Sequence, residues 1–266
     1  MRYAPVFKAL KTANKPAFVP FVTLGDPSYD LSFEIVKTLI DAGVSALELG
    51  FAFSDPIADG PVIQEGNLRA LRRANMAANF ELLERVRNLA PNIPIGLLVY
   101  ANLIVRFGVD RFYAACAKSG VDSVLVADVP LCEGAEFIKA AHQHAIAPVF
   151  LATPNASPEH LEHIAKNCPA FVYVLTRSGV TGTQEHLATT PQHILHTLKK
   201  ISPTPCLLGF GISQPSHVQS ALSMGADGVI CGSAIVQIIA QNLDHPPSML
   251  ARLSEFVAKM MGESQF

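Results

Sequence analysis

Short apolar runs alternate with amphipathic segments along the whole chain, and this alternation limits the possible folds more than any other feature. The amphipathic segments have the helical period, whereas the apolar runs have the length of buried strands. The expected strands are residues 18–24, 46–50, 95–100, 123–126, 147–151, 171–175, 206–209 and 228–231. The expected helices are residues 31–42, 79–90, 109–119, 134–144, 158–167, 191–200, 214–224 and 247–261. Strict strand–helix alternation predicts a parallel sheet of the α/β class, and eight such units in about 250 residues predict a (β/α)8 TIM barrel.

An internal repeat supports the barrel. Gly43, Gly120 and Gly225 each end a predicted helix and lead directly into a predicted strand, as expected of a helix C-terminal cap. The first and last of them are 182 residues apart, a distance that six strand–helix units of about 30 residues would fill. No linker interrupts the series, so we predict one domain over residues 1–266. An open, doubly wound sheet is the alternative fold.

The composition excludes several classes of partner. The 266 residues include 20 Lys+Arg and 22 Asp+Glu, which gives a net charge of −2, and the basic residues form no long run. Nucleic acid and anionic membrane surfaces are therefore not expected as partners. The N-terminus has no signal-peptide pattern and no window reaches 18 apolar residues, so we expect a cytoplasmic protein.

The reactive side chains occur in patterns that exclude some chemistry. The five cysteines contain no CxxC pair, so neither a disulfide framework nor a zinc site is expected. The nine histidines include no HExxH motif and none at a predicted strand end. No lysine falls on a predicted strand, so a Schiff-base lysine has no expected position. We therefore expect carboxylate acid–base chemistry, with no metal and no cofactor in this chain.

Two acidic residues in the stretch 46–64 are the candidates for that chemistry. Glu48 lies between leucines in a strand expected to be buried on both faces, where a lone charge usually points into a cavity or has a partner. Asp59 follows eleven positions later on a turn-rich loop. Two carboxylates near one strand end suit proton transfer. The alternatives are an ion-pair partner or cap for Glu48 and an ordinary turn residue for Asp59.

Glycine-rich segments follow the last two predicted strands, where TIM barrels commonly bind phosphate. They are residues 209–213 and 232–235, and the second opens a helical stretch whose N-terminus carries partial positive charge. We expect a phosphate site there, with a pair of tight turns as the alternative. The polar segment after the sixth strand, residues 176–184, has the length of an active-site lid, with simple disorder as its alternative.

Five segments carry a resemblance to a known family: LELGFAFSDPIADGPVIQ, PIGLLVYANLI, VDSVLVADVP, TRSGVTG and LLGFGIS. In this order, and over essentially the whole chain, they closely resemble the tryptophan synthase alpha subunit family. The resemblance implies a TIM barrel that cleaves indole-3-glycerol phosphate to indole and glyceraldehyde 3-phosphate. It also implies a partner, the beta subunit, which carries pyridoxal phosphate and receives the indole through a tunnel in an alpha2-beta2 complex.

The resemblance assigns roles to individual residues. Glu48 matches the family's general acid and base, and Asp59 matches the acid that hydrogen-bonds the indole N–H. Positions that resemble the substrate-binding residues are Phe21, Leu98, Tyr100, Leu125, Tyr173 and Thr181. The phosphate site is matched by Gly182, Gly211, Gly232 and Ser233. Arg177 and Thr181 resemble lid residues, and the positions that face the beta subunit are Asp55, Asn102 and Pro130.

One position departs from the family pattern. Ala52 stands where the family usually has a proline, so the loop lacks a constraint on φ. A free-standing lyase that releases its indole is therefore an alternative to the two-subunit enzyme. A phosphosugar isomerase or epimerase of the same fold would also be compatible with the pattern, as would a regulator that binds a phosphorylated metabolite.

Overall fold

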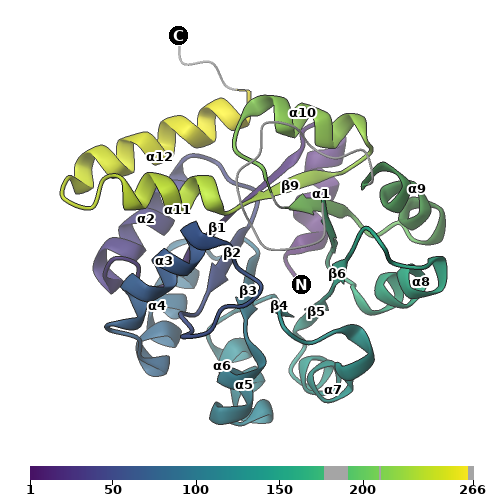
Figure 1. Ribbon diagram of the computed structural model, residues 1–266, viewed down its shortest axis with the longest axis horizontal. Coiled ribbons are helices and arrows are strands. Elements are labelled where there is room, and N and C mark those ends of the chain that lie inside the picture. Colours follow the sequence, from purple (N-terminus) through teal and green to yellow (C-terminus); the bar gives the residue numbers. More distant parts are fainter. Residues whose placement is uncertain (177–190, 210, 263–266) are drawn as a thin grey trace.

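The predicted barrel is present in the structure, a computed structural model that describes residues 1–176, 191–209 and 211–262. Nine strands in these ranges form one sheet in which every neighbouring pair is parallel. The sheet curls into a nearly closed barrel with helices around its outside (Figure 1). The α/β barrel prediction is therefore confirmed, and the open doubly wound sheet is not observed.

The elements follow the predicted order. The strands are β1 Ala17–Thr23, β2 Leu47–Gly50, β3 Ile95–Val99, β4 Ser123–Val126, β5 Ala147–Val149, β6 Leu151–Ala152, β7 Val172–Leu175, β8 Cys206–Gly209 and β9 Gly228–Cys231. The helices are α1 Tyr3–Thr12, α2 Tyr29–Asp41, α3 Pro61–Leu71, α4 Met76–Leu89, α5 Ala101–Phe107, α6 Val109–Lys118, η1 Leu131–Glu133, α7 Ala135–Gln143, α8 Pro158–Asn167, α9 Pro191–Ile201, α10 Pro215–Ser223, α11 Ser233–Ala240 and α12 Pro246–Met260. In the described ranges, no helix has both the length and the apolar character needed to cross a lipid bilayer.

The fifth predicted strand is divided in two, which the sequence did not indicate. Its first part, β5, pairs with β4 through Leu125 and Val149, whereas its second part, β6, pairs with β7 through Leu151 and Tyr173. Phe150 lies between them, and its N–H donates to the Cys168 thiol at 3.2 Å. β5 and β6 are therefore the two edge strands of the sheet, and the barrel is nearly closed where these edges meet.

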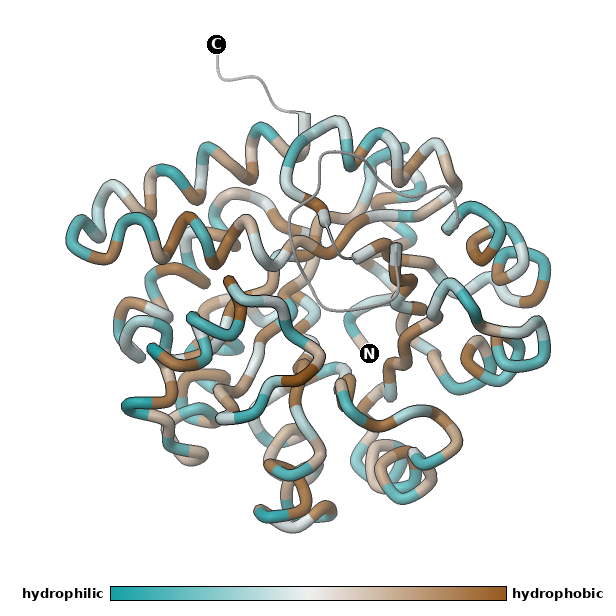
Figure 2. The backbone as a smooth tube through the Cα atoms, in the orientation of Figure 1, coloured by the Kyte–Doolittle hydropathy of each residue, from teal (hydrophilic) through white to brown (hydrophobic). Residues whose placement is uncertain are grey.

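The main core lies between the strands and the helices. Leucine, isoleucine, valine and phenylalanine from both layers form one buried cluster, and Figure 2 shows brown, hydrophobic positions along the strands while teal positions gather on the outer helices. Cys206 and Cys231 are both 0% exposed, and all five cysteines are free thiols. Burial of this apolar surface is the main stabilising contribution to the fold.

A second, smaller core fills the inside of the barrel. It includes Val19, Leu125, Tyr173 and Ile230, which come from four different strands. On β2 the leucines on either side of Glu48 belong to the outer core, and successive side chains of a strand point to opposite faces. Glu48 therefore points into the barrel, as its place between leucines predicts.

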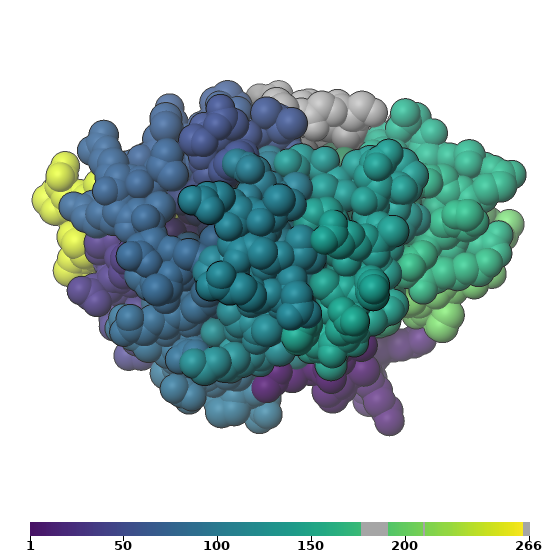
Figure 3. Space-filling view, turned by 90° about the horizontal axis from the view of Figure 1, so that it is seen from below, coloured from purple at the N-terminus to yellow at the C-terminus, as the bar shows by residue number. Residues whose placement is uncertain are grey.

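Four helices were not expected from the sequence: α1, α3, α5 and the short η1. The first of them lies at one end of the barrel, as the purple segment at the lower edge of the side view shows (Figure 3). It places Tyr3 in the inner core, where the hydroxyl forms a 2.9 Å hydrogen bond with Ser123 and the ring lies 5.4 Å from Phe171. Helix α1 thus closes the end of the barrel where the strands begin.

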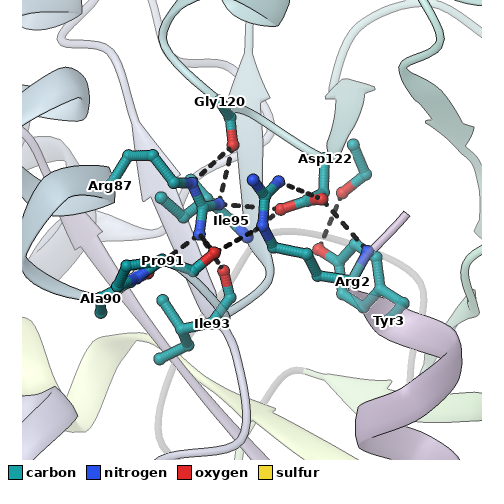
Figure 4. A network of polar contacts seen from close by, with 10 residues as sticks. Arg2, Tyr3, Arg87, Ala90, Pro91, Ile93, Ile95, Gly120 and Asp122 are labelled. Atoms are coloured by element: carbon teal, nitrogen blue, oxygen red, sulfur yellow. Dashed lines mark hydrogen bonds and ion pairs between the residues drawn. The ribbon is translucent and has the colours of Figure 1, made fainter.

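An arginine–aspartate network joins α1 to the start of the strands (Figure 4). Arg87 of α4 donates to the Gly120 carbonyl at 2.7 Å and to the Asp122 carboxylate at 2.9 Å. The same carboxylate accepts bonds of 3.0 Å from the Arg2 guanidinium and from the Ile95 N–H. Both oxygens of a buried carboxylate are therefore paired, which offsets the cost of removing the charge from water.

Candidate active site

One cavity at the carboxyl ends of the strands collects most of the residues identified in the sequence. It contains about 620 Å³ of empty space, its open mouth included, which is in the size range of small-molecule sites. The predicted site residues that line it are Phe21, Glu48, Asp59, Leu98, Leu125, Tyr173, Gly211, Gly232 and Ser233. The cavity thus brings together residues that are far apart in sequence. They come from strands β1, β2, β3, β4 and β7 and from the loops after β2, β8 and β9.

Glu48 is a buried carboxylic acid in the wall of this cavity. Its side chain is 5% exposed, and burial, followed by the nearby charge of Asp59, raises its pKa to about 8. Among the described residues no basic side chain forms an ion pair with it. At neutral pH the group therefore holds a proton that it can donate to a ligand.

Asp59 lies on the loop between β2 and α3, on the same cavity. Burial raises its pKa to about 6, and a hydrogen bond from Tyr100 opposes that shift. The loop is held locally, because the Asp59 N–H donates to the Pro56 carbonyl at 2.9 Å and Gln64 donates to the Asp59 carbonyl at 2.8 Å. At neutral pH Asp59 is mainly ionised while Glu48 is mainly protonated, so the two acids are suited to different roles.

Tyr173 of β7 lines the same cavity as Glu48 and Asp59. Burial and the charges of Glu48 and Asp59 raise its pKa well above the usual tyrosine value, so it is a neutral phenol. Its ring lies directly against Gly209, and a Cβ atom at that glycine would overlap the ring. The glycine at the end of β8 therefore makes room for the tyrosine in the cavity.

Apolar side chains form much of the cavity wall. Phe21, Leu98 and Leu125 come from three different strands, and the register places Phe21 beside Glu48. Such walls suit a flat aromatic group, which gains by leaving water and needs few polar partners. The arrangement is consistent with the predicted substrate-binding roles of Phe21, Leu98 and Leu125.

The part of the cavity formed by the loops after β8 and β9, here called its anion end, has the features of an anion site. Gly211 follows β8, and Gly232 with Ser233 begins helix α11. No lysine or arginine is among the described lining residues, so backbone N–H groups and the positive end of a helix are the groups available to an anion. This is the arrangement expected of a phosphate site after the last two strands of a barrel.

Three predicted site residues lie outside the described residues: Arg177, Thr181 and Gly182. The predicted lid and one of the four predicted phosphate-site positions therefore stay predictions. Their neighbour Thr176 is buried at the end of β7.

Tyr100 contacts the cavity through Asp59. It is a predicted substrate-binding residue but is not among the described lining residues, so that role stays a prediction. Its hydroxyl instead donates to Oδ2 of Asp59 at 2.9 Å and accepts the Ala58 N–H at 3.2 Å. Phe53 stacks on its ring with centroids 5.1 Å apart, so Tyr100 connects the end of β3 to the loop that carries Asp59.

Six lining residues were missed in the sequence: Ala58, Ile63, Ala127, Leu151, Ile212 and Ile230. Three of them had a detectable signal, the period of a strand. Ala127 follows Leu125 by two residues, Leu151 follows Val149 by two, and Ile230 precedes Gly232 by two. Ile63 was missed because α3 was not expected.

The residues predicted to face a partner are exposed near the mouth of the cavity. Asp55, Asn102 and Pro130 follow β2, β3 and β4, and all three are exposed. Two large apolar side chains from the same part of the chain are also exposed, Ile57 at 71% and Val105 at 57%. This side of the barrel therefore presents both polar and apolar groups to its surroundings.

No cluster of three or more His, Cys, Asp or Glu side chains suitable for a metal ion occurs among residues 1–176, 191–209 and 211–262. The chemistry of the cavity described so far is that of two carboxylic acids, one phenol and a set of backbone N–H groups.

Sequence comparisons identify a family. The family model described as tryptophan synthase alpha chain matches residues 7–265. A tryptophan synthase alpha chain of Helicobacter pylori strain Shi470 is 57% identical over 261 residues, which cover 98% of this chain and 100% of the relative. One of Aliivibrio fischeri strain ES114 is 48% identical over 265 residues, with 99% of each chain covered.

Solved structures agree with the sequence comparisons. A chain from the tryptophan synthase a2b2 complex of Pyrococcus furiosus superposes with a TM-score of 0.85 at 37% identity, covering 93% of this chain and 99% of that one. A chain of Mycobacterium tuberculosis tryptophan synthase gives a TM-score of 0.87 at 26% identity, with 98% of both chains covered. These matches cover nearly the whole chain, and they agree with the barrel and with the two acids in its cavity. The chain therefore belongs to the tryptophan synthase alpha chain family.

Proposed function

We propose that this chain cleaves indole-3-glycerol phosphate to indole and glyceraldehyde 3-phosphate in tryptophan biosynthesis, by a retro-aldol reaction that uses acid–base groups of the protein. The family is one of lyases, so the chain is an enzyme. The observation that carries the finer proposal is the pair of acids, Glu48 and Asp59, in one apolar cavity with different pKa values.

The bond to be broken joins C3 of the indole ring to the glyceryl carbon that bears a hydroxyl group. Cleavage leaves an electron pair on the ring carbon, and that pair needs an acceptor. No lysine of the described residues lines the cavity to form an imine, so the proposed acceptor is the indole ring itself. Protonation at C3 converts the ring to a cation that can take the electron pair.

Glu48 is proposed to supply and recover the proton. As an acid with a pKa of about 8, it is protonated at neutral pH and can donate to C3. The resulting carboxylate then takes the proton of the glyceryl hydroxyl as the carbon–carbon bond breaks and the aldehyde forms. One proton leaves Glu48 and one returns, so the residue ends the cycle in its starting state.

Asp59 is proposed to stabilise the cationic ring. Its carboxylate, with a pKa of about 6, is mainly ionised at neutral pH and can accept a hydrogen bond from the indole N–H. In a cavity with few water molecules a charge of opposite sign stabilises the cation more than it would in water. Thr181, Arg177 and the rest of the predicted lid would complete this end of the site when it closes.

The remaining residues are proposed to bind the two ends of the substrate. The apolar walls around Phe21, Leu98 and Leu125 suit the indole ring, and Tyr173 would lie beside the reacting carbon atoms. Gly211, Gly232 and Ser233, with Gly182 from the lid segment, would bind the phosphate. Anchoring the phosphate far from the reacting bond holds the ring against Glu48 and reduces the entropy loss of the reaction.

A beta subunit is the proposed partner, in an alpha2-beta2 complex in which that subunit carries pyridoxal phosphate. The a2b2 complex of the Pyrococcus furiosus relative supports this pairing, as does the exposed surface with Asp55, Asn102 and Pro130. Ala52 is 5% exposed next to this surface. The Phe53 N–H donates to Asn67 of α3 at 3.1 Å, so the loop is held without the family proline.

An indole-release assay on the isolated chain tests the proposal. Indole-3-glycerol phosphate is supplied, indole is measured, and the assay is repeated with a tryptophan synthase beta subunit added. Indole formation that the partner increases supports the two-subunit lyase. Full activity alone, with no change on addition and no complex by gel filtration, would instead support a free-standing lyase. No indole under either condition would refute the proposed reaction.

A further inference from the structure

His217 is a buried histidine that contacts the backbone of the loop after β8. It is 3% exposed, and its Nδ1 accepts a 3.3 Å hydrogen bond from the Ser213 N–H. The same loop carries Gly211 and Ile212, which line the anion end of the cavity. The imidazole itself is not among the described lining residues, so it contacts the loop from behind.

The place of His217 in α10 explains this contact. Gln214 is the N-cap residue, it forms no side-chain cap, and Pro215 is the first helical residue, so His217 is the third. A polar side chain at that third position often turns back to accept a backbone N–H at the helix start, as in a capping box. His217 does this for Ser213, the residue that joins the loop to the helix.

The second ring nitrogen is also bonded. His217 Nε2 lies 2.9 Å from the side-chain amide of Gln214. The atom of the amide that faces Nε2 is the Gln214 nitrogen. Because Nδ1 accepts the Ser213 N–H, the neutral ring carries its proton on Nε2, and this N–H can donate to the amide when the amide group is turned so that its oxygen faces the ring. The Ser213 bond thus sets the tautomer and the orientation of the ring.

Other contacts also hold residues 211–213, since the Ile212 side chain is 3% exposed and belongs to the outer core. Gly211 has a φ of +78°, a left-handed conformation in which glycine costs no strain but gives the chain no rigidity. The Ile212 carbonyl accepts a bond from the Cys231 thiol at 3.1 Å, and a thiol is a weak donor. The bond from Ser213 to His217 adds a side-chain acceptor at the point where residues 211–213 meet the start of α10.

We propose that His217 is a positioning residue for phosphate binding, which keeps residues 211–213 in the conformation that forms the anion end of the cavity. The inference rests on the proposed function, because it assumes that the substrate phosphate binds there. A loop that is already ordered loses less conformational entropy when the anion binds, and this lowers the Kd. His217 does not touch the substrate in this proposal.

A matched pair of variants tests the role. His217→Asn keeps an acceptor oxygen the same number of bonds from the backbone as Nδ1, whereas His217→Leu removes the acceptor and keeps similar volume. The Kd for inorganic phosphate and the Kd for indole are measured by calorimetry on the full chain, with KM and kcat for indole-3-glycerol phosphate. Thermal unfolding verifies that both variants are folded.

The expected result is a loss of phosphate affinity without a loss of indole affinity. His217→Leu raises the phosphate Kd and KM about tenfold, the effect of one lost hydrogen bond, and leaves the indole Kd unchanged, while His217→Asn stays within about threefold of the wild type. Wild-type phosphate affinity in His217→Leu, an equal loss in both variants, or a parallel loss of indole affinity would overturn the inference. A wild-type chain that binds no phosphate and forms no indole would instead refute the proposed function itself.

Discussion

The Tyr100 hydroxyl donates a 2.9 Å hydrogen bond to Oδ2 of Asp59, and the two residues are 41 positions apart in sequence. The bond joins the end of β3 to the loop after β2, and the Ala58 N–H donates to the same hydroxyl. A hydrogen bond to the charged form of an acid lowers its pKa. Tyr100 therefore keeps Asp59 ionised over a wider range of pH than burial alone would allow.

Tyr100→Phe is expected to move the acid limb of the pH–activity profile. Without the hydroxyl the pKa of Asp59 rises above about 6. The variant therefore protonates Asp59 at a higher pH than the wild type does, and the acid limb of its profile moves to higher pH. The measurement is kcat/KM for indole formation from about pH 5 to about pH 9, a range that spans both acids. Tyr113→Phe, which removes a buried hydroxyl elsewhere in the core, is the control and should keep the wild-type limb.

Glu48→Gln is expected to reduce kcat for indole formation by about 10³-fold, the size of effect typical of a lost general acid and base. The amide has the same shape but can neither donate a proton to C3 nor recover one from the hydroxyl. Glu34→Gln, which changes an exposed carboxylate on α2, should keep full activity. A Glu48→Gln variant as active as the wild type would remove Glu48 from the mechanism.

Glu48 also gives a prediction for stability against pH. Its pKa is about 8 in the fold and 4.5 when exposed, so between these values the native state holds a proton that the unfolded chain loses. Its favourable contribution is complete below pH 4.5 and is lost as pH rises toward 8, at roughly 1.4 kcal/mol for each unit that separates the two pKa values. Urea unfolding at about pH 5 and about pH 8.5 should give wild type a larger loss than Glu48→Gln. Equal losses would mean that Glu48 is not protonated in the fold.

Gly209→Ala is expected to destabilise the protein by about 1–3 kcal/mol, the usual cost of overpacking a filled interior. The added methyl group would overlap the Tyr173 ring and push it away from Glu48, so kcat should also fall. In a Gly209→Ala/Tyr173→Leu double variant the smaller side chain removes the overlap, and chemical denaturation should give less than the sum of the two single effects. Additive effects would show that the ring and the glycine are not in contact.

Two arginines on α4 should differ greatly in their contribution to stability. Arg87→Lys cannot reproduce the bonds to Gly120 and Asp122 and should lower the free energy of unfolding by about 3 kcal/mol, since it leaves a buried acid partly unpaired. Arg85→Lys affects a 3.6 Å pair with Asp30, which is 97% exposed, and should change it by less than about 0.5 kcal/mol. Denaturant titration of both variants measures the difference. A similar effect for both would contradict the structural role of the network.

The barrel and the direction of Glu48 could be predicted because both depend on residues close together in sequence. The alternation of apolar runs with helical segments sets the order of the strands, and the glycines at 43, 120 and 225 all have positive φ in the structure. The leucines beside Glu48 determine which face of β2 is buried against helices. The acid between them must then face the inside of the barrel.

The contacts that complete the site depend on residues far apart in the chain, and only the tertiary structure decides them. The hydroxyl of Tyr100 is bonded to Asp59, 41 residues earlier. At the break between β5 and β6, the Phe150 N–H donates to Cys168, 18 residues later. Alternation specifies that a side chain faces inward, but it does not specify which inward groups from different strands come within hydrogen-bond distance. The sequence therefore determined the fold and the two acids, whereas packing around the closed barrel determined their pKa values and their hydrogen-bond partners, because desolvation and hydrogen bonding depend on distances in space.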